Sequence, residues 1–446
     1  MKKELILIAI LLFYSPYIIF SQNKLVDYVD REDIEFLKKM AEDVMESSRI
    51  YPNQKVSEKF GPNATGGVLI RPGGRDCYPS FWIRDYAMSL DCRLVSATEQ
   101  LHMLKLTAAT QADQTWITRA GGMVPLGAIA DHIRIDDSLP VYFPGTYSYE
   151  EQGTPQWGTF PPYSDQFFFV HMAYMYVKST GNSSILYEQI NGITLKERLE
   201  RAFVVPPSHL DNHIVYTTEK LRGVDFGFRD AICLTGDLSI ASVFKYRAAL
   251  QMEELCNSIG EQGRAKYYKE VTEKIKSAIL ELFYNERGLL LASTGIGAQG
   301  DVWCTALAAY LGILEEEQLI KTSRTLAEAY KQGELSYRGN VRHILVSDDY
   351  SEETAWEKTH VKKEEYQNGS YWGTPVGWVS HTIAITDKQS AAMMVKEYIE
   401  ELRENDFRKG EEYGAPYECF NKKGTRQNPV YLTTVTSPLA VFLMGK

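Results

Sequence analysis

The sequence has no excess of positive charge, since 48 lysine and arginine residues stand against 58 aspartate and glutamate residues and the formal net charge is −10. Nucleic-acid binding needs concentrated positive charge, so we expect no nucleic-acid partner. The sequence also has only one long apolar run, Leu5–Phe20. We therefore expect no stable membrane insertion of the rest of the chain.

Several catalytic motifs are also missing. Neither H-E-x-x-H nor G-x-S-x-G occurs. His209 and His213 are four residues apart, but the prolines just before them argue against a helix that would present both to a metal. Residues 295–300 match G-x-G-x-x-G, but no strand and helix frame the match, so we interpret it as a flexible loop. We expect neither a metal ion nor a cofactor.

The cysteines lack the short paired spacings of zinc sites. There are six, far apart in the sequence: Cys77, Cys92, Cys233, Cys256, Cys304 and Cys419. Three of them lie inside apolar helical patterns, so we expect most of the six to be free, buried thiols. At least one disulfide is the alternative if the chain is exported.

The N-terminal residues have the pattern of a secretory signal peptide. Two lysines precede the apolar run Leu5–Phe20, and Ser21 follows it. We expect residues 1–21 to be removed by cleavage near Ser21, and the protein to be secreted or periplasmic. No Ser/Gly linker divides residues 22–446, so we expect one domain, as a monomer or weak homo-oligomer.

The helical periodicity repeats along the chain. A loop that carries Trp, Tyr, Asp or Glu leads into an apolar helix, and an amphipathic helix follows. The expected helices are Arg31–Ser48, Tyr86–Leu106, a shorter one near Thr107–Thr118, Ser164–Lys178, Ile185–Ala202, Leu238–Ser258, Gly263–Tyr284, Val302–Gly312, Glu315–Gln332, Tyr371–Thr386, Gln389–Asn405 and Leu432–Met444. Apolar helices belong inside and striped ones outside. We predict an all-α, (α/α)6 toroid of about twelve helices with a loop-borne active site.

Residues 80–91 hold the most informative cluster of side chains. Trp82 provides an aromatic plane, Arg84 a fork of donors and Asp85 a carboxylate, at the start of a helical pattern. Sugars bind to this combination, because an apolar ring face stacks on an aromatic and hydroxyls bond to charged partners. The alternative is an Arg–Asp pair in which Asp85 caps the helix.

Four segments carry a resemblance to a known superfamily: Trp82–Asp85, Asp225–Asp230, Tyr366–Trp378 and Pro416–Glu418. Their order and setting resemble the six-hairpin glycosidases, namely the glucoamylases, the processing α-glucosidases and the amylo-1,6-glucosidase-like proteins, which are built on an (α/α)6 barrel. The resemblance implies an exported glycoside hydrolase that acts on an oligosaccharide or polysaccharide, with an inverting general acid/base mechanism.

The resemblance also implies roles for single residues. Arg84 and Asp85 would hold hydroxyls of the sugar. Asp230 would be the general acid, with Asp225 as its rival, and two nearby phenylalanines would raise the pKa of the acid. Glu418, in the last loop, would be the general base. The alternative for each acid is a simple ion pair with a neighbouring arginine or lysine.

Further polar and aromatic residues are expected at the sugar site. Amides donate to and accept from hydroxyls, and aromatic rings stack on sugars. The candidates are Gln367, Asn368, Tyr371 and Trp372, together with Asp165 and Gln166, which open a helix and resemble a loop that lines the sugar site in related enzymes. Asp165 fits a plain helix N-cap equally well.

Other functions fit the same barrel. One alternative is a uronic-acid-type glycosidase, and another is a phosphorylase, which would need a phosphate pocket of Arg, Lys or His. A third is a non-catalytic glycan-binding protein that keeps the cleft. All of them need distant loops to converge, because Asp230 and Glu418 are far apart in the sequence.

Overall fold

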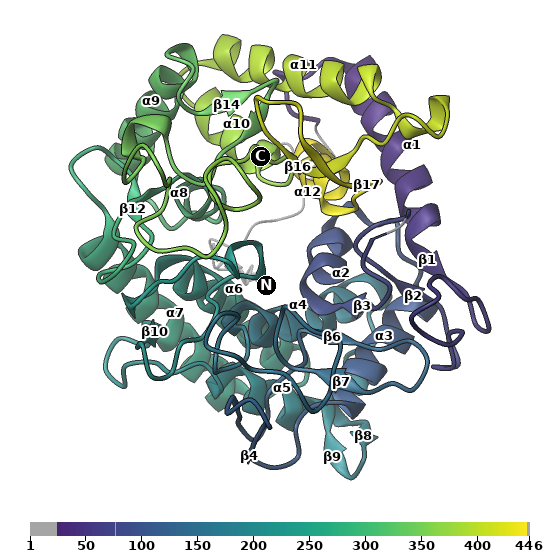
Figure 1. Ribbon diagram of the computed structural model, residues 1–446. Helices are drawn as coiled ribbons and strands as arrows, with labels where there is room; N and C mark the ends of the chain where they lie inside the picture. Colours follow the sequence, from purple (N-terminus) through teal and green to yellow (C-terminus); the bar gives the residue numbers. More distant parts are fainter. Residues whose placement is uncertain (1–24, 76, 444–446) are drawn as a thin grey trace, which may run out of the picture.

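The computed structural model describes residues 25–75 and 77–443, and its helices form two concentric rings (Figure 1). The inner helices contact one another in a closed cycle, in the order α2, α4, α6, α8, α10, α12 and back to α2. They are α2 (Ile83–Ser89), α4 (Tyr163–Thr180), α6 (Ser239–Ser258), α8 (Val302–Tyr310), α10 (Val376–Ala384) and α12 (Thr433–Leu443). The signal peptide expected at residues 1–21 lies outside the described residues.

The outer helices cover this cycle. They are α1 (Arg31–Ser48), α3 (Ala97–Ala109), α5 (Leu195–Val204), α7 (Gln262–Phe283), α9 (Glu316–Lys331) and α11 (Lys388–Glu404). Each one packs on an inner helix: α1 on α12, α3 and α5 on α4, α7 on α6, and α9 and α11 on α10. The predicted (α/α)6 toroid of twelve helices is therefore confirmed for the described residues.

The apolar patterning explains the two rings. All residues of α8 except the last are buried, whereas α1 buries a stripe that includes Ile34, Leu37, Ala41 and Val44. A helix without a polar face needs neighbours on every side, and a striped helix needs them on one side only. The described ends of the chain close the ring, because the Val26 N–H donates to the Phe442 carbonyl at 3.2 Å.

The predicted single helix Tyr86–Leu106 is wrong. The helix α2 ends at Ser89, a 3₁₀-helix spans Leu90–Cys92, and α3 starts after Ser96. Ser96 and Glu99 form a reciprocal capping box, which starts a new helix and separates α3 from α2. The short helix predicted near Thr107–Thr118 is also wrong, since α3 ends at Ala109 and a strand occupies residues 116–117.

The predicted helix Ile185–Ala202 is correct only in its last part, α5. A 3₁₀-helix (Ser183–Tyr187) and a hairpin of two short strands come first. Asn191 and Gly192 connect these strands, both with positive φ, of 51° and 77°. An Asn-Gly pair favours such a hairpin turn, and it interrupts the helical pattern.

Short antiparallel strands decorate the helices, in two-stranded sheets and one three-stranded sheet with the order β3-β6-β7. The strands are β1 (Arg49–Ile50), β2 (Leu69–Ile70), β3 (Phe81–Trp82), β4 (Trp116–Ile117), β5 (Met123–Val124), β6 (His132–Ile133), β7 (Pro140–Val141), β8 (Gln189–Ile190), β9 (Ile193–Thr194), β10 (Tyr216–Thr217), β11 (Gly236–Asp237), β12 (Leu290–Leu291), β13 (Gly300–Asp301), β14 (Ser336–Tyr337), β15 (Asn340–Val341), β16 (Tyr417–Phe420) and β17 (Arg426–Pro429).

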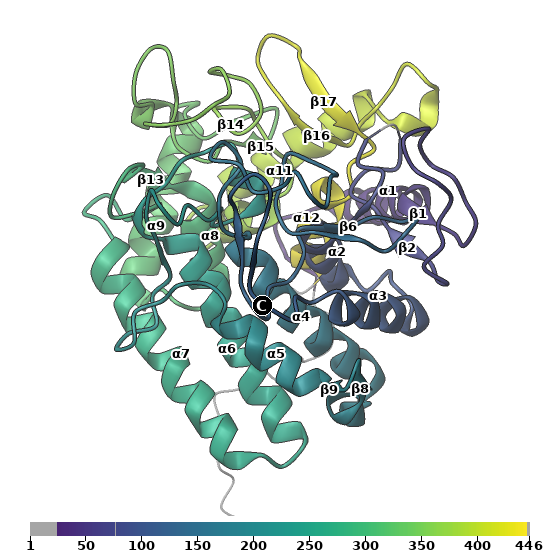
Figure 2. The ribbon, with the colours of Figure 1, turned by 60° about the horizontal axis from the view of Figure 1, so that its bottom comes forward.

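The long loops gather at one end of the barrel. Figure 2 shows β13, β14–β15 and β16–β17 at the upper end, and α5, α7 and the β8–β9 hairpin toward the lower end. The strands β3, β11 and β13 lead directly into the inner helices α2, α6 and α8. The loops that carry the sequence motifs therefore meet at this end.

Two further properties of the described residues bear on the sequence-based expectations. No helix in residues 25–75 and 77–443 is long and apolar enough to cross a bilayer. Cys92, Cys256, Cys304 and Cys419 are buried thiols that form no disulfide.

Candidate active site

A cavity of about 370 Å³ lies among the loops that precede five of the inner helices, α2, α4, α6, α10 and α12. It brings together five of the residues expected at a sugar site: Trp82, Arg84, Asp85, Asp230 and Glu418. Further lining residues are Tyr78, Asp131, Tyr147, Trp157, Gly227, Phe228, Tyr366, Asn428 and Tyr431. The loops therefore converge as the toroid requires.

Arg84 is the centre of the most deeply buried part of the lining. Its side chain is 6% exposed, and its Nη1 donates to Asp131 at 2.5 Å and to Asp165 at 3.3 Å. Its Nε lies 3.8 Å from Asp85. Burial disfavours the charge of Arg84, but the three carboxyls outweigh that effect and raise the pKa of the guanidinium. Asp165 thus acts as a partner of Arg84 from behind the lining.

Aromatic rings form a wall beside Arg84. Trp82 stacks on His132, with ring centroids 4.3 Å apart and planes at 18°. Tyr78 and Tyr147 meet Trp82 edge-on, at 5.0 and 5.6 Å. The ring of His132 is held in turn by a 2.7 Å contact between its Nδ1 and Asp131. The wall is therefore fixed to the same carboxylate that holds Arg84.

Asp230 follows a 3₁₀-helix (Gly227–Arg229) and is 7% exposed. Gln367 Nε2 donates to its Oδ1 at 2.7 Å, and Gln367 Oε1 accepts from the Ala231 N–H at 2.7 Å. Burial raises the pKa of Asp230 to about 6. Gln367, predicted to contact ligand, thus uses its amide to orient this acid and does not line the cavity.

Glu418 lies on β16 and is 1% exposed. Three groups donate hydrogen bonds to its carboxyl: the Tyr78 hydroxyl at 2.9 Å, the Tyr366 hydroxyl at 3.2 Å and the Asn428 amide. Burial nevertheless raises the pKa of Glu418 to about 7. Two carboxyls with raised pKa values, from loops far apart in the sequence, therefore share one cavity.

Asp225, the rival acid, does not line the cavity. It pairs with Arg229, which also pairs with Asp301. Asp301 in turn caps α8 by accepting from the Cys304 N–H at 3.0 Å. This buried Asp225–Arg229–Asp301 triad ties the loop before α6 to the start of α8.

The other expected site residues lie behind the lining: Asp165, Gln166, Asn368, Tyr371 and Trp372. Gln166 accepts from the Ile129 N–H at 2.8 Å, and Asn368 Oδ1 accepts from the Ala355 N–H at 2.9 Å. These amides are used to satisfy loop backbone, because buried N–H groups in irregular segments need side-chain partners.

Sequence reasoning missed several lining residues. The β16–β17 hairpin pairs Tyr417 with Pro429, which brings Asn428 beside Glu418. Tyr431 follows the same hairpin and donates to Asp85 at 2.6 Å. Gly424 lies in the turn between the two strands, with a φ of 89°, but a single glycine does not show which residues a hairpin pairs. Tyr78 stands just before the Trp82 motif and has no signal of its own.

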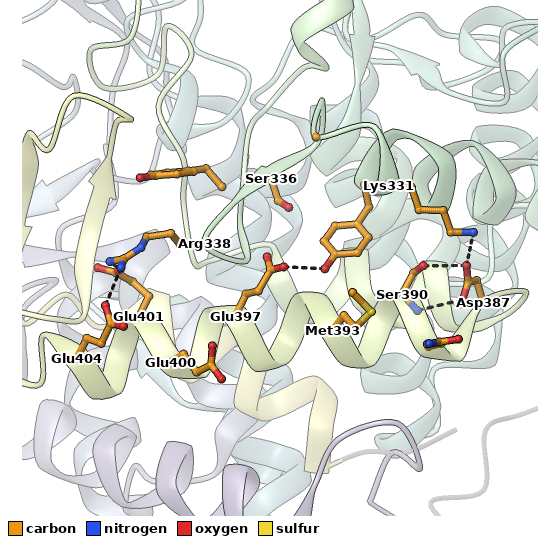
Figure 3. A pocket seen from close by; sticks show the side chains of 14 residues that line it. Lys331, Ser336, Arg338, Asp387, Ser390, Met393, Glu397, Glu400, Glu401 and Glu404 are labelled. Carbon is orange, nitrogen blue, oxygen red and sulfur yellow. Dashed lines mark hydrogen bonds and ion pairs between the residues drawn. The ribbon is translucent and has the colours of Figure 1, made fainter.

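A second hollow, of about 810 Å³, lies on the outer ring between α9, α11 and the β14–β15 hairpin (Figure 3). Most of its acidic side chains are paired, for example Asp387 with Lys331 at 2.7 Å and Glu404 with Arg338 at 2.7 Å. It contains none of the expected site residues. Among the described residues, no cluster of three or more His, Cys, Asp or Glu side chains is arranged to hold a metal ion.

Comparison with solved structures supports the fold. A rhamnosidase from Klebsiella oxytoca with rhamnose bound matches with a TM-score of 0.56 and 11% identity, over 95% of this chain and 66% of that chain. Glucoamylase from Saccharomycopsis fibuligera matches with a TM-score of 0.56 and 11% identity, over 95% of this chain and 98% of that chain. A family 15 glucoamylase from Hypocrea jecorina matches with a TM-score of 0.59 and 11% identity, over 92% of this chain and 71% of that chain.

At this identity the comparisons show a shared fold alone, the (α/α)6 barrel that the helical pattern predicted. No protein-family model matches the sequence, and no curated protein matches it.

We predict that Gly227→Ala disrupts the Arg84 position. A Cβ at residue 227 would lie 1.8 Å from Arg84 Nε, and the guanidinium has no room to move because carboxylates surround it. We expect a less stable protein with at least about tenfold weaker ligand binding or turnover, since a lost charge-assisted contact costs about 1.5–3 kcal/mol. Gly263→Ala, which meets no atom within 4 Å, is the control. Unchanged binding in Gly227→Ala would contradict this prediction.

We predict that Arg229→Met destabilises the fold, because it leaves Asp225 and Asp301 buried without their cation. Removing one partner of a buried ion pair costs about 3–5 kcal/mol. Urea denaturation measures the loss. Arg119→Met is the control, because Arg119 pairs with Glu150 and Glu151 on the surface and should change the unfolding free energy by about 1 kcal/mol or less. Equal effects of the two substitutions would contradict the prediction.

Proposed function

We propose that this protein is a glycoside hydrolase that cleaves an O-glycosidic bond by an inverting general acid/base mechanism. The observation that carries the proposal is the pair Asp230 and Glu418, which lie in one cavity with Trp82 and Arg84. The barrel shared with a rhamnosidase and two glucoamylases supports it.

In the proposed reaction, Asp230 donates a proton to the glycosidic oxygen as the bond to the anomeric carbon breaks. Glu418 takes a proton from a water molecule, whose oxygen attacks the opposite face of that carbon. The products are a free sugar of inverted configuration and an alcohol. The three hydrogen bonds donated to Glu418 fix its carboxylate in place for this step.

We propose that Trp82, Arg84 and Asp85 bind the sugar whose bond is cleaved. All three residues are buried, with exposed fractions of 6%, 5% and 2%. A buried aromatic plane excludes water from one face of a sugar ring, and charged groups bond to its hydroxyls.

The charge of the cavity favours an uncharged sugar over the alternatives. Among the described residues, Arg84 is the only Lys, Arg or His in the lining, and three carboxyls already surround it. A uronic acid or a phosphate ion would enter beside Asp230 and Glu418 without a free cation to pair with. The charge of the cavity therefore favours a hydrolase of neutral glycosides over a uronic-acid-type glycosidase or a phosphorylase.

We further propose that the protein is exported, on the strength of the signal-peptide pattern in residues 1–21. Its substrate would then be an extracellular or periplasmic oligosaccharide or polysaccharide.

Two substrates that differ in their leaving group distinguish the roles of Asp230 and Glu418. We predict that Asp230→Asn loses about 10²–10⁴-fold in turnover of an oligosaccharide, which needs protonation, but keeps most of its turnover of the matching glycosyl fluoride, which does not. Glu418→Gln should lose turnover of both. Glu400→Gln is the matched control, because Glu400 lines the second hollow on the outer ring. Its turnover of both substrates should be unchanged.

The measurement starts with a panel of neutral gluco-, galacto-, manno- and rhamno-configured oligosaccharides and fluorides, with the first-formed anomer followed by NMR. Retention of configuration would contradict the inverting mechanism. Binding without release of sugar from any member of the panel would instead identify a glycan-binding protein.

We predict a bell-shaped dependence of kcat/KM on pH. The base acts when ionised, so activity rises as pH increases through its pKa, and the acid acts when protonated, so activity falls as pH increases through its pKa. With pKa values of about 6 for Asp230 and about 7 for Glu418, the maximum lies midway, at about pH 6.5.

Exchanging the roles of the two acids leaves this bell unchanged, because the values belong to the pair. A steady rise or fall of kcat/KM through neutral pH would contradict the prediction.

A further inference from the structure

The cavity becomes more exposed toward one loop. Its inner residues Arg84, Asp85 and Glu418 are buried, whereas Gly145 is exposed and Trp157 is half-buried. The loop that carries Gly145 and Trp157 precedes α4 and forms one wall of the opening. We therefore expect a sugar chain that places its terminal residue against Arg84 to leave the cavity along this wall.

The Trp157 indole is held in place against the wall by two contacts. A Cβ at Gly145 would lie 2.4 Å from Trp157 Cγ, so only a glycine lets the ring pack this closely on the loop. The His360 ring meets the indole at 80°, with centroids 4.4 Å apart. Trp157 remains half-buried and lines the cavity.

A buried arginine fixes this wall relative to the proposed acid. Arg222 donates through Nη1 to the carbonyls of Pro155 and Gln156, just before Trp157. Through Nη2 it donates to the carbonyl of Asp230 at 3.2 Å and to that of Ile232 at 3.3 Å. The same guanidinium thus spans the two segments. It bonds to the backbone of Asp230 and leaves the carboxyl to Gln367.

The loop that carries His360 is tied to the same place. The His360 N–H and the Thr359 hydroxyl both donate to the Ala231 carbonyl, at 3.3 and 3.0 Å. Trp157, His360 and Asp230 therefore belong to one hydrogen-bonded unit, although three separate segments of the chain supply them.

We propose that Trp157 is the platform for the sugar ring of the leaving group, so the substrate class is an oligosaccharide or polysaccharide and not the glycoside of a small alcohol. This inference rests on the proposed function. The general acid protonates the oxygen that joins the two sugars, so the ring on the far side of that oxygen lies beside the acid. Trp157 is a half-buried aromatic side chain of the lining, and Arg222 ties its segment to the backbone of Asp230.

The test compares two substrates with the same terminal sugar: the oligosaccharide of the panel that the wild-type protein cleaves best, and the corresponding glycosyl fluoride, whose leaving group has no ring. We expect Trp157→Ala to lower kcat/KM for the oligosaccharide about tenfold, mainly through KM, because it removes stacking and apolar burial. Turnover of the fluoride should stay within about twofold of wild type. Trp157→Phe should restore part of the loss.

The matched control is Trp116→Ala. Trp116 belongs to the same loop region and stacks on Tyr149 at 5.2 Å, but it does not line the cavity. We expect Trp116→Ala to leave kcat/KM for the oligosaccharide and turnover of the fluoride unchanged. Thermal unfolding of each variant shows that the fold is intact, and Trp157→Phe serves for the comparison if Trp157→Ala does not fold.

Two outcomes overturn the inference while the hydrolase stands: equal losses on both substrates, which mark a structural role for Trp157, and no loss on either, which removes the indole from the substrate path. If the wild-type protein cleaves neither the oligosaccharides nor the fluorides, the proposed function fails and this inference falls with it.

Discussion

The buried guanidinium of Arg84 is the interaction on which the rest of the site depends. It stands at the start of α2 and bonds to Asp131 and Asp165, which precede and open α4. Neither the cation nor the carboxylates would be stable in this interior alone, because an unpaired buried charge costs several kcal/mol. Pairing them joins two neighbouring inner helices at the end where the cavity opens. The stacked Trp82–His132 wall is attached to the same cluster through Asp131.

The closed ring of inner helices brings Asp230 and Glu418 into one cavity, which the cluster around Arg84 does not do. Their loops precede α6 and α12, which are not neighbours in the cycle of inner helices. Both loops nevertheless face the same opening, because every inner helix starts from the same end of the barrel. The toroid thus lets a chain place groups from distant segments around one cavity without any local sequence signal for their proximity.

The sequence predicted those features that depend on local pattern. Apolar and striped helices alternate, so the two rings and most helix bounds were predictable, and Trp82, Arg84, Asp85, Asp230 and Glu418 stand in recognisable segments. The errors arose where short-range chemistry overrides periodicity, as at the Ser96 capping box and the Asn191–Gly192 turn. The remaining gaps are long-range. Nothing in the sequence reveals that Asn428 returns to Glu418, or that the Gln367 amide serves Asp230.

Burial links the chemistry of the cavity to its selectivity. The same exclusion of water that raises the pKa values of Asp230 and Glu418 also makes any further charge in the cavity costly. The proposed reaction needs the form in which Glu418 is ionised and Asp230 is protonated. A neutral sugar leaves this balance intact, whereas an anionic one would push protons onto both acids and remove the base. The raised pKa values of the carboxyl pair and the proposed preference for uncharged glycosides therefore have one physical origin.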